Sequence, residues 1–542
     1  MVILKLLLSW VVVFGVHLAI VKGETPHRRP KGVPRDPFHE PVGQTRYYQH
    51  YYGNLTEKMR ETMDGTCTFV HSGEDSNKHA DLVVDVLHPS AAMVERWKSV
   101  PPSQTWFDPN ICKGAEKFFR QIVGCTRGVA LHPDCPRCHR ERTEKVCKMA
   151  TGEPLIIPEA LKTRQDPDVE ASSPWIATGH NAYVARCGAV SLPCGGVMTR
   201  TQCGGIRDED GAELRDRCFP NGNPGAFSLP PNECSNATVY DRVFIMSYKY
   251  DNAIGHFLTE VLPRLAFHFD LLTDKKRPVH IHYGCDSKFG SFSPPLKYIS
   301  WLGLDRARLV QGEVFAKEIM VPREGACQDL MFNRWEFLKM RDMVLARAGL
   351  GARVNWAVRK VKGRGRVVVE GTDGNVDAPV VAGKPIMLVL QRSRSQMSAR
   401  RGDVTRLWPT DFFEKVLTAI ETAFPEYDVT PFSDKNHTML NCIECQLDLF
   451  TRSTVMVGMH GAGLSNMMFM PIGATLVEIT PGLDGRMLPG SGPFSRMAMA
   501  SGVHHVYHHL LKDMQVFSRH GTTFDPATLI EVMQRALPAI GN

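Results

Sequence analysis

Between residues 385 and 480, short apolar runs alternate with longer amphipathic stretches. The stretches have the length and apolar spacing of helices, as in "DFFEKVLTAIETAF" (411–424), where Asp411 and Glu414 are also spaced as a capping box. The apolar runs are short enough to predict strands. These runs are "PIMLVLQR" (385–392), "YDVTPF" (427–432), "TVMVGM" (454–459) and "ATLVEIT" (474–480). Apolar strands separated by helices predict a parallel, doubly wound sheet.

A less regular alternation covers residues 240–359, where we expect strands near 239–248 and 278–284. The stretch "IGHFLTEVLPRLAFHFDLLT" (254–273) carries apolar residues at helical spacing. A segment rich in glycine and charge, 360–384, predicts a linker or a surface loop. The chain is therefore predicted to be an α/β protein with two Rossmann-like halves. The expected boundaries are 236–359 for the first half and 385–542 for the second.

The first 235 residues have a different texture. An apolar run from Leu6 to Val21 predicts a signal peptide within 1–23, with an uncleaved signal anchor as the alternative. Residues 24–60 are polar and rich in proline and tyrosine, as in a linker, and 61–235 are rich in cysteine. The signal segment places the remaining chain in a secretory lumen, either released or held by a single-pass membrane anchor.

Composition agrees with a lumenal address. The chain of 542 residues contains 15 cysteines, of which eleven lie between Cys67 and Cys234, and disulfides suit an oxidising compartment. Asn54, Asn236 and Asn436 begin glycosylation sequons. A net charge of +7 is small for this length, and no basic helix carries interleaved aromatic residues, so nucleic acid is not an expected partner.

Three clusters permit a metal as an alternative interpretation. "CPRC" (135–138), with Cys125 and Cys147 nearby, is predicted to form disulfides, although zinc or redox chemistry would also use such cysteines. "HHVYHH" (504–509) falls on an expected strand, where alternate side chains point to opposite faces, so half of its histidines at most converge. "DED" (208–210) fits an Asp-x-Asp motif but lies among glycine and charged residues, as in a solvated loop.

The candidate chemistry begins at the turn that follows the strand 454–459. In doubly wound sheets, ligands bind at the carboxyl ends of strands. A glycine turn lets backbone N–H groups approach a phosphate, and a following helix favours its charge. The alternative is a tight structural turn with its histidine in the core. The residues involved are His460, Gly461, Ala462, Gly463, Ser465 and Asn466, of which Asn466 is expected to fix the turn.

Two further groups complete the candidate site. Arg392 ends the strand 385–392 at the same predicted sheet edge, where a guanidinium could grip a diphosphate in bidentate fashion. Arg394, Arg400 and Arg401 follow in a loop whose alternative is a solvated surface. His256 and Glu260 lie one turn apart on a helix, an arrangement that suits a general base, although a surface pair has the same spacing.

Taken together, "GHFLTEVLPRL", "VLQRSRS" and "STVMVGMHGAGLSNMMFMPIGATLVEITPG" resemble glycosyltransferase family 61. The resemblance covers about 240–510, with the three blocks in the family's order, whereas 24–235 show no match. It implies a GT-B-like fold, an inverting mechanism, a UDP-sugar donor and a glycoprotein or glycan acceptor. UDP-GlcNAc and UDP-xylose are the leading donors, with UDP-arabinose behind them. The expected compartment is the endoplasmic reticulum or Golgi lumen.

The resemblance also implies residue roles. Arg392 and the turn at His460 would hold the diphosphate, and Glu478 would line the nucleotide cleft. Glu260 would be the base on a helix that faces the cleft, so that neither a metal nor a cofactor is expected. The chain lacks the family's Asn-Glu pair after the arginines, so either Arg400 or Arg401 could take the second arginine's role. A non-catalytic binding module remains the alternative, while an α/β-hydrolase is disfavoured because the chain has no Gly-x-Ser-x-Gly elbow.

Overall fold

The computed structural model divides into two compact units, Met1–Tyr48 and Gln49–Asn542, and every described residue lies in the second. The structure describes residues 69–71, 80–108, 155–156, 174–185, 188, 190–193, 197–198, 237–247, 254–284, 294–322, 334–361, 365–371, 379–392, 407–481, 493–510, 515–518 and 521–540. Several predictions lie outside these residues. They concern the signal segment 1–23, the linker 24–60, the cysteines from Cys125 to Cys147, "DED" (208–210), Asn54, Asn236, Arg394, Arg400 and Arg401.

The second half of the chain forms a seven-stranded sheet in the order β15-β14-β16-β17-β18-β3-β4. All neighbours are parallel except the last pair. Its strands are β14 (Ile386–Gln391), β15 (Asp428–Ser433), β16 (Ser453–Met459), β17 (Thr475–Pro481), β18 (His504–Leu510), β3 (Gln104–Phe107) and β4 (Leu155–Ile156). The predicted α/β class and the four predicted strands are confirmed.

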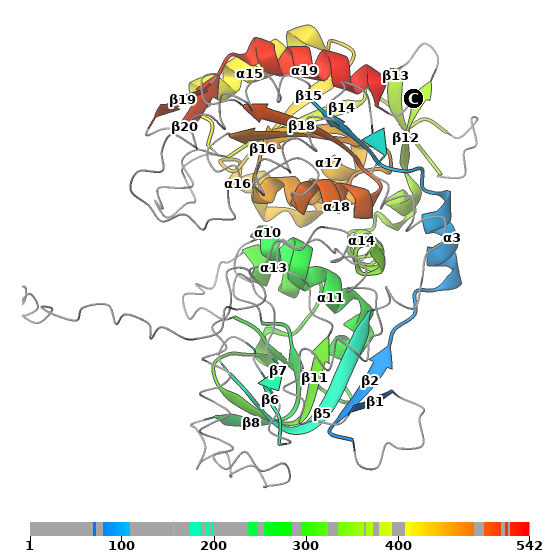
Figure 1. Cartoon of the computed structure of the whole chain (residues 1–542), viewed down its shortest axis with the longest axis vertical. Coiled ribbons are helices and arrows are strands. Elements are labelled where there is room, and N and C mark those ends of the chain that lie inside the picture. The colour runs from blue at the N-terminus through cyan, green and yellow to red at the C-terminus, as the bar shows by residue number, and fades with distance from the viewer. Residues whose placement is uncertain are drawn as a thin grey trace, which may run out of the picture. The chain divides into compact units, whose positions relative to one another are not determined.

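Helices cover both faces of this sheet (Figure 1). In β14, Met387 and Val389 pack with α15 (Thr410–Ala423) and α19 (Pro526–Ala539) in one hydrophobic cluster. Leu388 and Leu390 pack on the other face with α17 (Ile443–Arg452) and α18 (Pro493–Ser501). This two-sided burial explains why the strands read as continuous apolar runs.

The helix α15 begins one residue before the predicted start. Its N-cap is Pro409, which makes no side-chain capping bond, so the predicted capping box of Asp411 and Glu414 is wrong. Pro409 accepts the first helical bond from Phe413 N at 2.8 Å, which moves Asp411 into the first turn, where a carboxylate still favours the helix dipole. The apolar residues that give this stretch its helical spacing are buried, namely Phe413, Val416, Leu417, Ile420 and Phe424.

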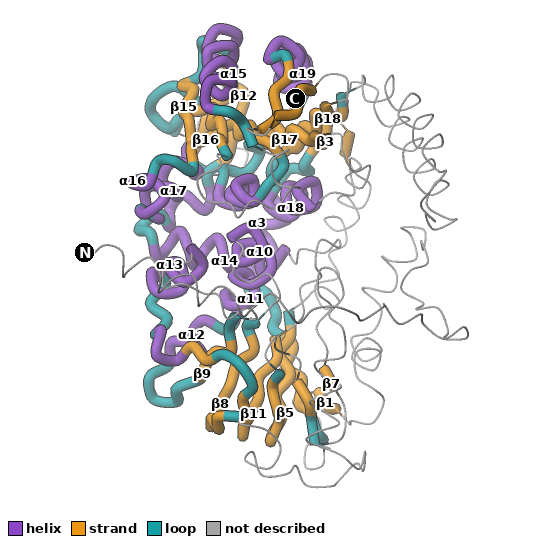
Figure 2. The backbone as a smooth tube through the Cα atoms, turned by 90° about the vertical axis from the view of Figure 1, so that its left-hand side faces the viewer, coloured by secondary structure: helices purple, strands orange, loops and turns teal. Residues whose placement is uncertain are grey.

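The other large sheet has nine strands, and its main order is β1-β2-β5-β11-β8-β9-β10. Figure 2 shows β5, β11 and β8 side by side. The strands are β1 (Phe69–His71), β2 (Leu82–Val86), β5 (Trp175–Val184), β6 (Val190–Ser191), β7 (Val197–Met198), β8 (Thr238–Ile245), β9 (His280–His282), β10 (Leu309–Val310) and β11 (Val314–Pro322). Described segments of the cysteine-rich region thus supply strands to both sheets, which the sequence pattern did not indicate.

Helical segments follow β8, β9 and β11. They are α10 (Ile254–His256), the π-helical turn η3 (Phe257–Val261), α11 (Leu262–Phe267), α12 (Phe269–Thr273), α13 (Pro294–Trp301), η4 (Arg306–Arg308), α14 (Arg334–Arg347) and η5 (Gly351–Asn355). Earlier in the chain, α3 (Ala91–Ser99) comes directly before β3 of the seven-stranded sheet. Leu262 and Leu265 of α11 share one hydrophobic cluster with Leu388 and Met456 of the parallel sheet, so a continuous core joins the helices of the nine-stranded sheet to the seven-stranded one.

The segment 360–384, predicted as a linker or loop, contains most of a β-hairpin. Strands β12 (Ala357–Val361) and β13 (Gly365–Val369) pair antiparallel, and Val367 and Val369 are buried. A second hairpin, β19 (Gln515–Ser518) with β20 (Gly521–Phe524), precedes α19. Glycine and charge dominate 360–384, but the apolar run at 367–369 was enough to form a buried strand.

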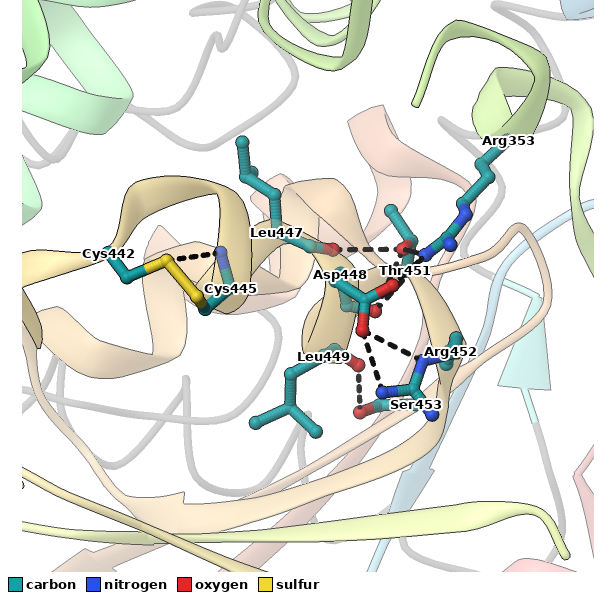
Figure 3. A network of polar contacts seen from close by, with 9 residues as sticks. All are labelled: Arg353, Cys442, Cys445, Leu447, Asp448, Leu449, Thr451, Arg452 and Ser453. Carbon is teal, nitrogen blue, oxygen red and sulfur yellow. Dashed lines mark hydrogen bonds and ion pairs between the residues drawn. A yellow bond between two sulfur atoms is a disulfide. The ribbon is translucent and has the colours of Figure 1, made fainter. Parts of the chain in front are cut away.

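A disulfide joins Cys442 and Cys445 where α16 (His437–Asn441) meets α17 (Figure 3). Cys442 Sγ accepts a hydrogen bond from Cys445 N, at 3.1 Å, and so caps α17. At the other end of α17, Asp448 binds Arg353 at 2.6 Å and Arg452 at 2.7 Å. Both ends of this helix are therefore fixed, and the helix supports the strand β16 that leads to the candidate site.

Candidate functional site

The glycine turn lies at the carboxyl end of the central strand β16, as predicted. His460 N donates to Ile479 O at 2.8 Å, and the chain then enters η8 (Ala462–Phe469), a 3₁₀-helix where a helix was expected. Asn466 Nδ2 donates to Gly463 O at 3.0 Å. This bond closes the turn on itself, in agreement with the expected role of Asn466.

Arg392 lies directly against this turn. It follows β14, which pairs with β16 so that Leu390 lies opposite Gly458. A Cβ atom added at Gly461 would be 2.9 Å from Arg392 Nη1. The backbone at Gly461 is extended, with φ 168°, which any residue can adopt. A side chain at position 461 would therefore displace the end of the Arg392 side chain, whereas a Cβ at Gly463 would meet only ordinary contacts.

The helix that carries His256 and Glu260 packs against the same turn. A Cβ atom on Gly255 would lie 2.9 Å from Ala462 Cβ and 3.7 Å from Ser465 Oγ. The absence of a side chain at Gly255 thus lets α10 approach η8 closely. Two regions about 200 residues apart in sequence, those around Gly255 and Ala462, meet at this point.

Glu260 occupies an unusual position in that helix. It lies in the π-helical turn η3, a feature that occurs frequently at functional sites. Its Oε1 binds His256 Nδ1 at 2.9 Å, and the side chains of His256 and Glu260 are 28% and 5% exposed. Its Oε2 is buried and, among the described residues, has no hydrogen-bond partner. A buried carboxylate oxygen without a donor is costly to maintain. It can accept a proton, or a hydrogen bond from a hydroxyl group.

Glu478 does not present its carboxylate to solvent. It is buried, with Oε1 bound by His460 Nδ1 and Oε2 bound by His505 Nε2 at 2.8 Å. The expected role of Glu478 in lining a nucleotide cleft stays a prediction. The structure shows a carboxylate that bridges two histidines, one at the glycine turn and one on the neighbouring strand β18.

The two histidines keep Glu478 ionised. Burial alone would raise the pKa of this carboxyl, but the hydrogen bonds and charges of His460 and His505 outweigh it and lower the pKa from 4.5 to about 2. Tyr507, next to Glu478, has its pKa raised by burial and by the negative charge of Glu478. The carboxylate is therefore a fixed negative charge behind the turn at neutral pH.

His505 is the residue that the sequence analysis did not single out as part of this site. The sequence "HHVYHH" suggests a metal cluster, but alternation along β18 separates its histidines, as predicted. His505 binds Glu478, whereas His504 Nδ1 accepts from Gln104 N at 2.9 Å and His508 Nδ1 lies 3.3 Å from Asp108. Within the part of the chain that the structure describes, no group of three or more histidine, cysteine or acidic residues is placed to hold a metal ion.

One predicted glycosylation site lies within the described residues. Asn436 is exposed, and its side-chain oxygen accepts from Met439 N at 3.0 Å as the N-cap of α16. This bond uses the oxygen and not the amide nitrogen that would carry a glycan. Glycosylation at Asn436 stays a prediction.

The membrane prediction concerns the N-terminus of the chain. Across the ranges described above, none of the helices has both the length and the apolar character for a membrane span. The segment 1–23, for which a signal peptide or an anchor was expected, lies outside those ranges.

Comparisons with known proteins agree with the motifs. Residues 254–477 match the family described as Glycosyltransferase 61. The chain is also similar to two proteins of Oryza sativa subsp. japonica, alpha-1,3-arabinosyltransferases XAT3 and XAT2, with 32% and 31% identity over 103 residues. Each similarity covers 19% of this chain and only 15% of the relative's length. The matched family segment begins at the helix of His256 and ends one residue before Glu478, and it confirms the resemblance of this chain to glycosyltransferase family 61.

Proposed function

We propose that this protein is an inverting glycosyltransferase that uses a UDP-sugar. The observation that carries the proposal is the convergence on one glycine turn of the Arg392 guanidinium and of the helix that holds His256 and Glu260. The family match and the arabinosyltransferases similar to part of the chain support a glycosyltransferase. A GT-B-like layout of two domains behind a disulfide-rich region belongs to the same proposal.

Each part of the site has a role in a single displacement. The acceptor hydroxyl oxygen forms the new bond to the anomeric carbon from the face opposite UDP, and its proton passes to Glu260. The bond from the anomeric carbon to the UDP oxygen breaks, and UDP leaves with the electron pair. Arg392, with backbone N–H groups of the turn, stabilises the charge that develops on the diphosphate.

Glu260 is suited to the base's role because Oε1 is held by His256 while Oε2 has no partner among the described residues. One oxygen is thus fixed, and the other, which is buried, has no donor among the described residues that would compete with an acceptor hydroxyl. His256 orients the carboxylate, as the third group orients a base in other catalytic sets.

The donor and acceptor are narrower parts of the proposal. GlcNAc and xylose are the sugars expected from the family resemblance, and the arabinosyltransferase names of the two similar proteins favour a pentose. The acceptor would be a protein-linked glycan or a Ser/Thr hydroxyl in the lumen of the endoplasmic reticulum or Golgi. Because Arg392 supplies positive charge at the turn, we expect UDP to bind without a divalent cation.

The test is a thermal-shift titration with UDP, with and without Mn²⁺ and a chelator, followed by hydrolysis assays with UDP-xylose, UDP-arabinose and UDP-GlcNAc. We expect UDP to raise the melting temperature equally in both conditions and one UDP-sugar to be turned over. UDP binding without any turnover or transfer would favour a non-catalytic binding module with the same fold. A strict need for Mn²⁺ would contradict the role given to Arg392.

A further inference from the structure

His460 is held from behind by a chain of buried side chains. Glu478 binds His460 through one oxygen and His505 through the other, and Ser495 Oγ lies 3.0 Å from His505 Nδ1. Ser495, His505 and Glu478 are exposed by 1%, 0% and 3%. We call Ser495–His505–Glu478 the buried chain.

The chemistry of these groups fixes which nitrogen carries the proton. An ionised carboxylate only accepts hydrogen bonds. His460 must therefore carry a proton on Nδ1, and His505 must carry one on Nε2. With Nε2 donating to Glu478, Nδ1 is the atom through which His505 contacts the Ser495 hydroxyl. Every member of the buried chain is satisfied in one arrangement of protons.

The outer nitrogen of His460 is left for another partner. The ring contacts Glu478 through Nδ1. Among the described residues, no hydrogen bond involves the other ring nitrogen, Nε2. Phe494 packs edge-on against the ring, with centroids 4.9 Å apart. Phe494 and Ser495 are neighbours in the first turn of α18, so one helix end restrains both His460 and His505.

Charged and titratable groups surround His460 from several elements. Glu478 comes from β17 and His505 from β18. Arg392, after β14, contacts the next residue, Gly461, while His256 and Glu260 belong to the helical segment that packs on η8. The ring thus binds a fixed carboxylate, and the next residue along the chain, Gly461, lies against the arginine assigned to the diphosphate.

We propose that Ser495, His505 and Glu478 are positioning residues that hold His460 as the Nδ1–H tautomer and direct Nε2 toward the diphosphate of the donor. The inference rests on the proposed function for the identity of the ligand. The tautomer itself follows from the hydrogen bonds of Glu478 with the two histidines.

The first experiment measures the tautomer without any ligand. The chain is labelled with [¹⁵N]histidine, and long-range ¹H–¹⁵N correlation spectra identify the protonated nitrogen of each ring. The signals of His460 are assigned from a His460→Gln variant. We expect Nδ1 to be protonated in the wild-type chain and the Nε2–H tautomer to appear in Glu478→Gln. An Nε2–H ring in the wild-type chain would overturn the proposal whether or not UDP binds.

The second experiment separates positioning from packing. In His505→Gln, the side-chain amide takes the place of Nε2 and still donates to Glu478, whereas in His505→Asn it takes the place of Nδ1 and does not reach. With the turned-over UDP-sugar, we expect kcat/KM to fall about hundredfold in Glu478→Gln and about tenfold in His505→Asn. The fall should lie in kcat, and His505→Gln should stay within about twofold of wild type.

Ser495→Ala and Ser495→Thr provide a milder pair if the histidine variants fold poorly, and the exposed His437→Asn is the surface control. Equal kcat/KM values for His505→Gln and His505→Asn, both folded, would contradict the positioning role. Absence of UDP binding in a wild-type chain that shows the predicted tautomer would reject the proposed function and with it the assignment of a diphosphate to Nε2. The arrangement Ser495–His505–Glu478–His460 would then stand as a property of the fold alone.

Discussion

Two histidine–carboxylate pairs meet the same glycine turn, and they differ in how they are built. His256 and Glu260 lie four residues apart on one helix, with the histidine 28% exposed and one carboxylate oxygen without a partner among the described residues. His460 and Glu478 come from the ends of two parallel strands, and Glu478 has both oxygens bound by histidines.

This difference suits Glu260 to react with a substrate and suits Glu478 to hold the neighbouring histidines in position. A carboxylate with an unused oxygen can take a proton, whereas a carboxylate with a pKa of about 2 and two donors keeps its charge over the physiological range. The two pairs therefore predict different consequences for the same chemical change, the replacement of Glu by Gln.

The largest expected effect is on turnover in Glu260→Gln. Removing the base should lower kcat by about 10³-fold, within the range that general-base catalysis supplies, while UDP still binds. Single-turnover kinetics with the preferred UDP-sugar would measure it, and Glu414→Gln on the exposed surface of α15 is the matched control. Near-normal turnover in folded Glu260→Gln would remove Glu260 from the mechanism.

Besides its effect on turnover, Glu478→Gln should lower stability in a pH-dependent way. The pKa of Glu478 is lowered from 4.5 to about 2 in the folded protein, so its ionisation stabilises the fold above pH 4.5, and this contribution disappears as the pH falls toward 2. The shift corresponds to about 3 kcal/mol of unfolding free energy at pH 7.

Denaturant unfolding of wild type and Glu478→Gln at pH 7 and pH 3 measures this contribution. The gap between the two proteins should narrow at pH 3, whereas Glu414→Gln should show little gap at either pH. A gap of equal size at both values would mean that the charge of Glu478 is not what stabilises the fold.

Arg392→Ala should weaken UDP binding about hundredfold, because charge-assisted hydrogen bonds to phosphate are lost. Arg392→Lys should recover only part of this loss, since a lysine cannot bind in bidentate fashion. Calorimetric titration with UDP provides the dissociation constants, and Lys415→Ala on the exposed face of α15 is the control. Unchanged binding in Arg392→Ala would separate the arginine from the donor.

The smallest expected effect comes from Gly255→Ala, which tests the contact between the two pairs. The new methyl group would lie 2.9 Å from Ala462 Cβ and 3.1 Å from its Cα, so the helix must move away at a cost of about 1–3 kcal/mol. We expect a lower melting temperature and a several-fold lower kcat. Gly351→Ala is the control, because its nearest neighbour would be at 3.6 Å, and equal effects of the two substitutions would argue against a specific contact at Gly255.

Much of the parallel sheet could be predicted from the sequence, while the nine-stranded sheet could be predicted only in part. The strands β14, β16 and β17 are buried along their length, so hydrophobicity alone marks them, whereas β15 is a partly exposed edge strand. β5 lies between β2 and β11, and its pairing with β11 brings Trp175–Val184 beside Val314–Pro322. Such long-range antiparallel pairing leaves no periodic signal in a single segment.

The sequence by itself determined the candidates for chemistry that lie within one element or at a strand end. These are the i, i+4 spacing of His256 and Glu260, the arginine that ends β14 and the glycine turn after β16. Local periods and turn residues carry this information, because it depends on backbone geometry over a few residues.

Only the tertiary structure decided how these candidates combine. The approach of Arg392 to Gly461, the contact of Gly255 with Ala462 and the bridge from His460 through Glu478 to His505 all depend on strand order and register. A shift of one residue along β18 would turn His505 to the other face of the sheet. The sequence "HHVYHH" therefore does not reveal which of its four histidines reaches Glu478.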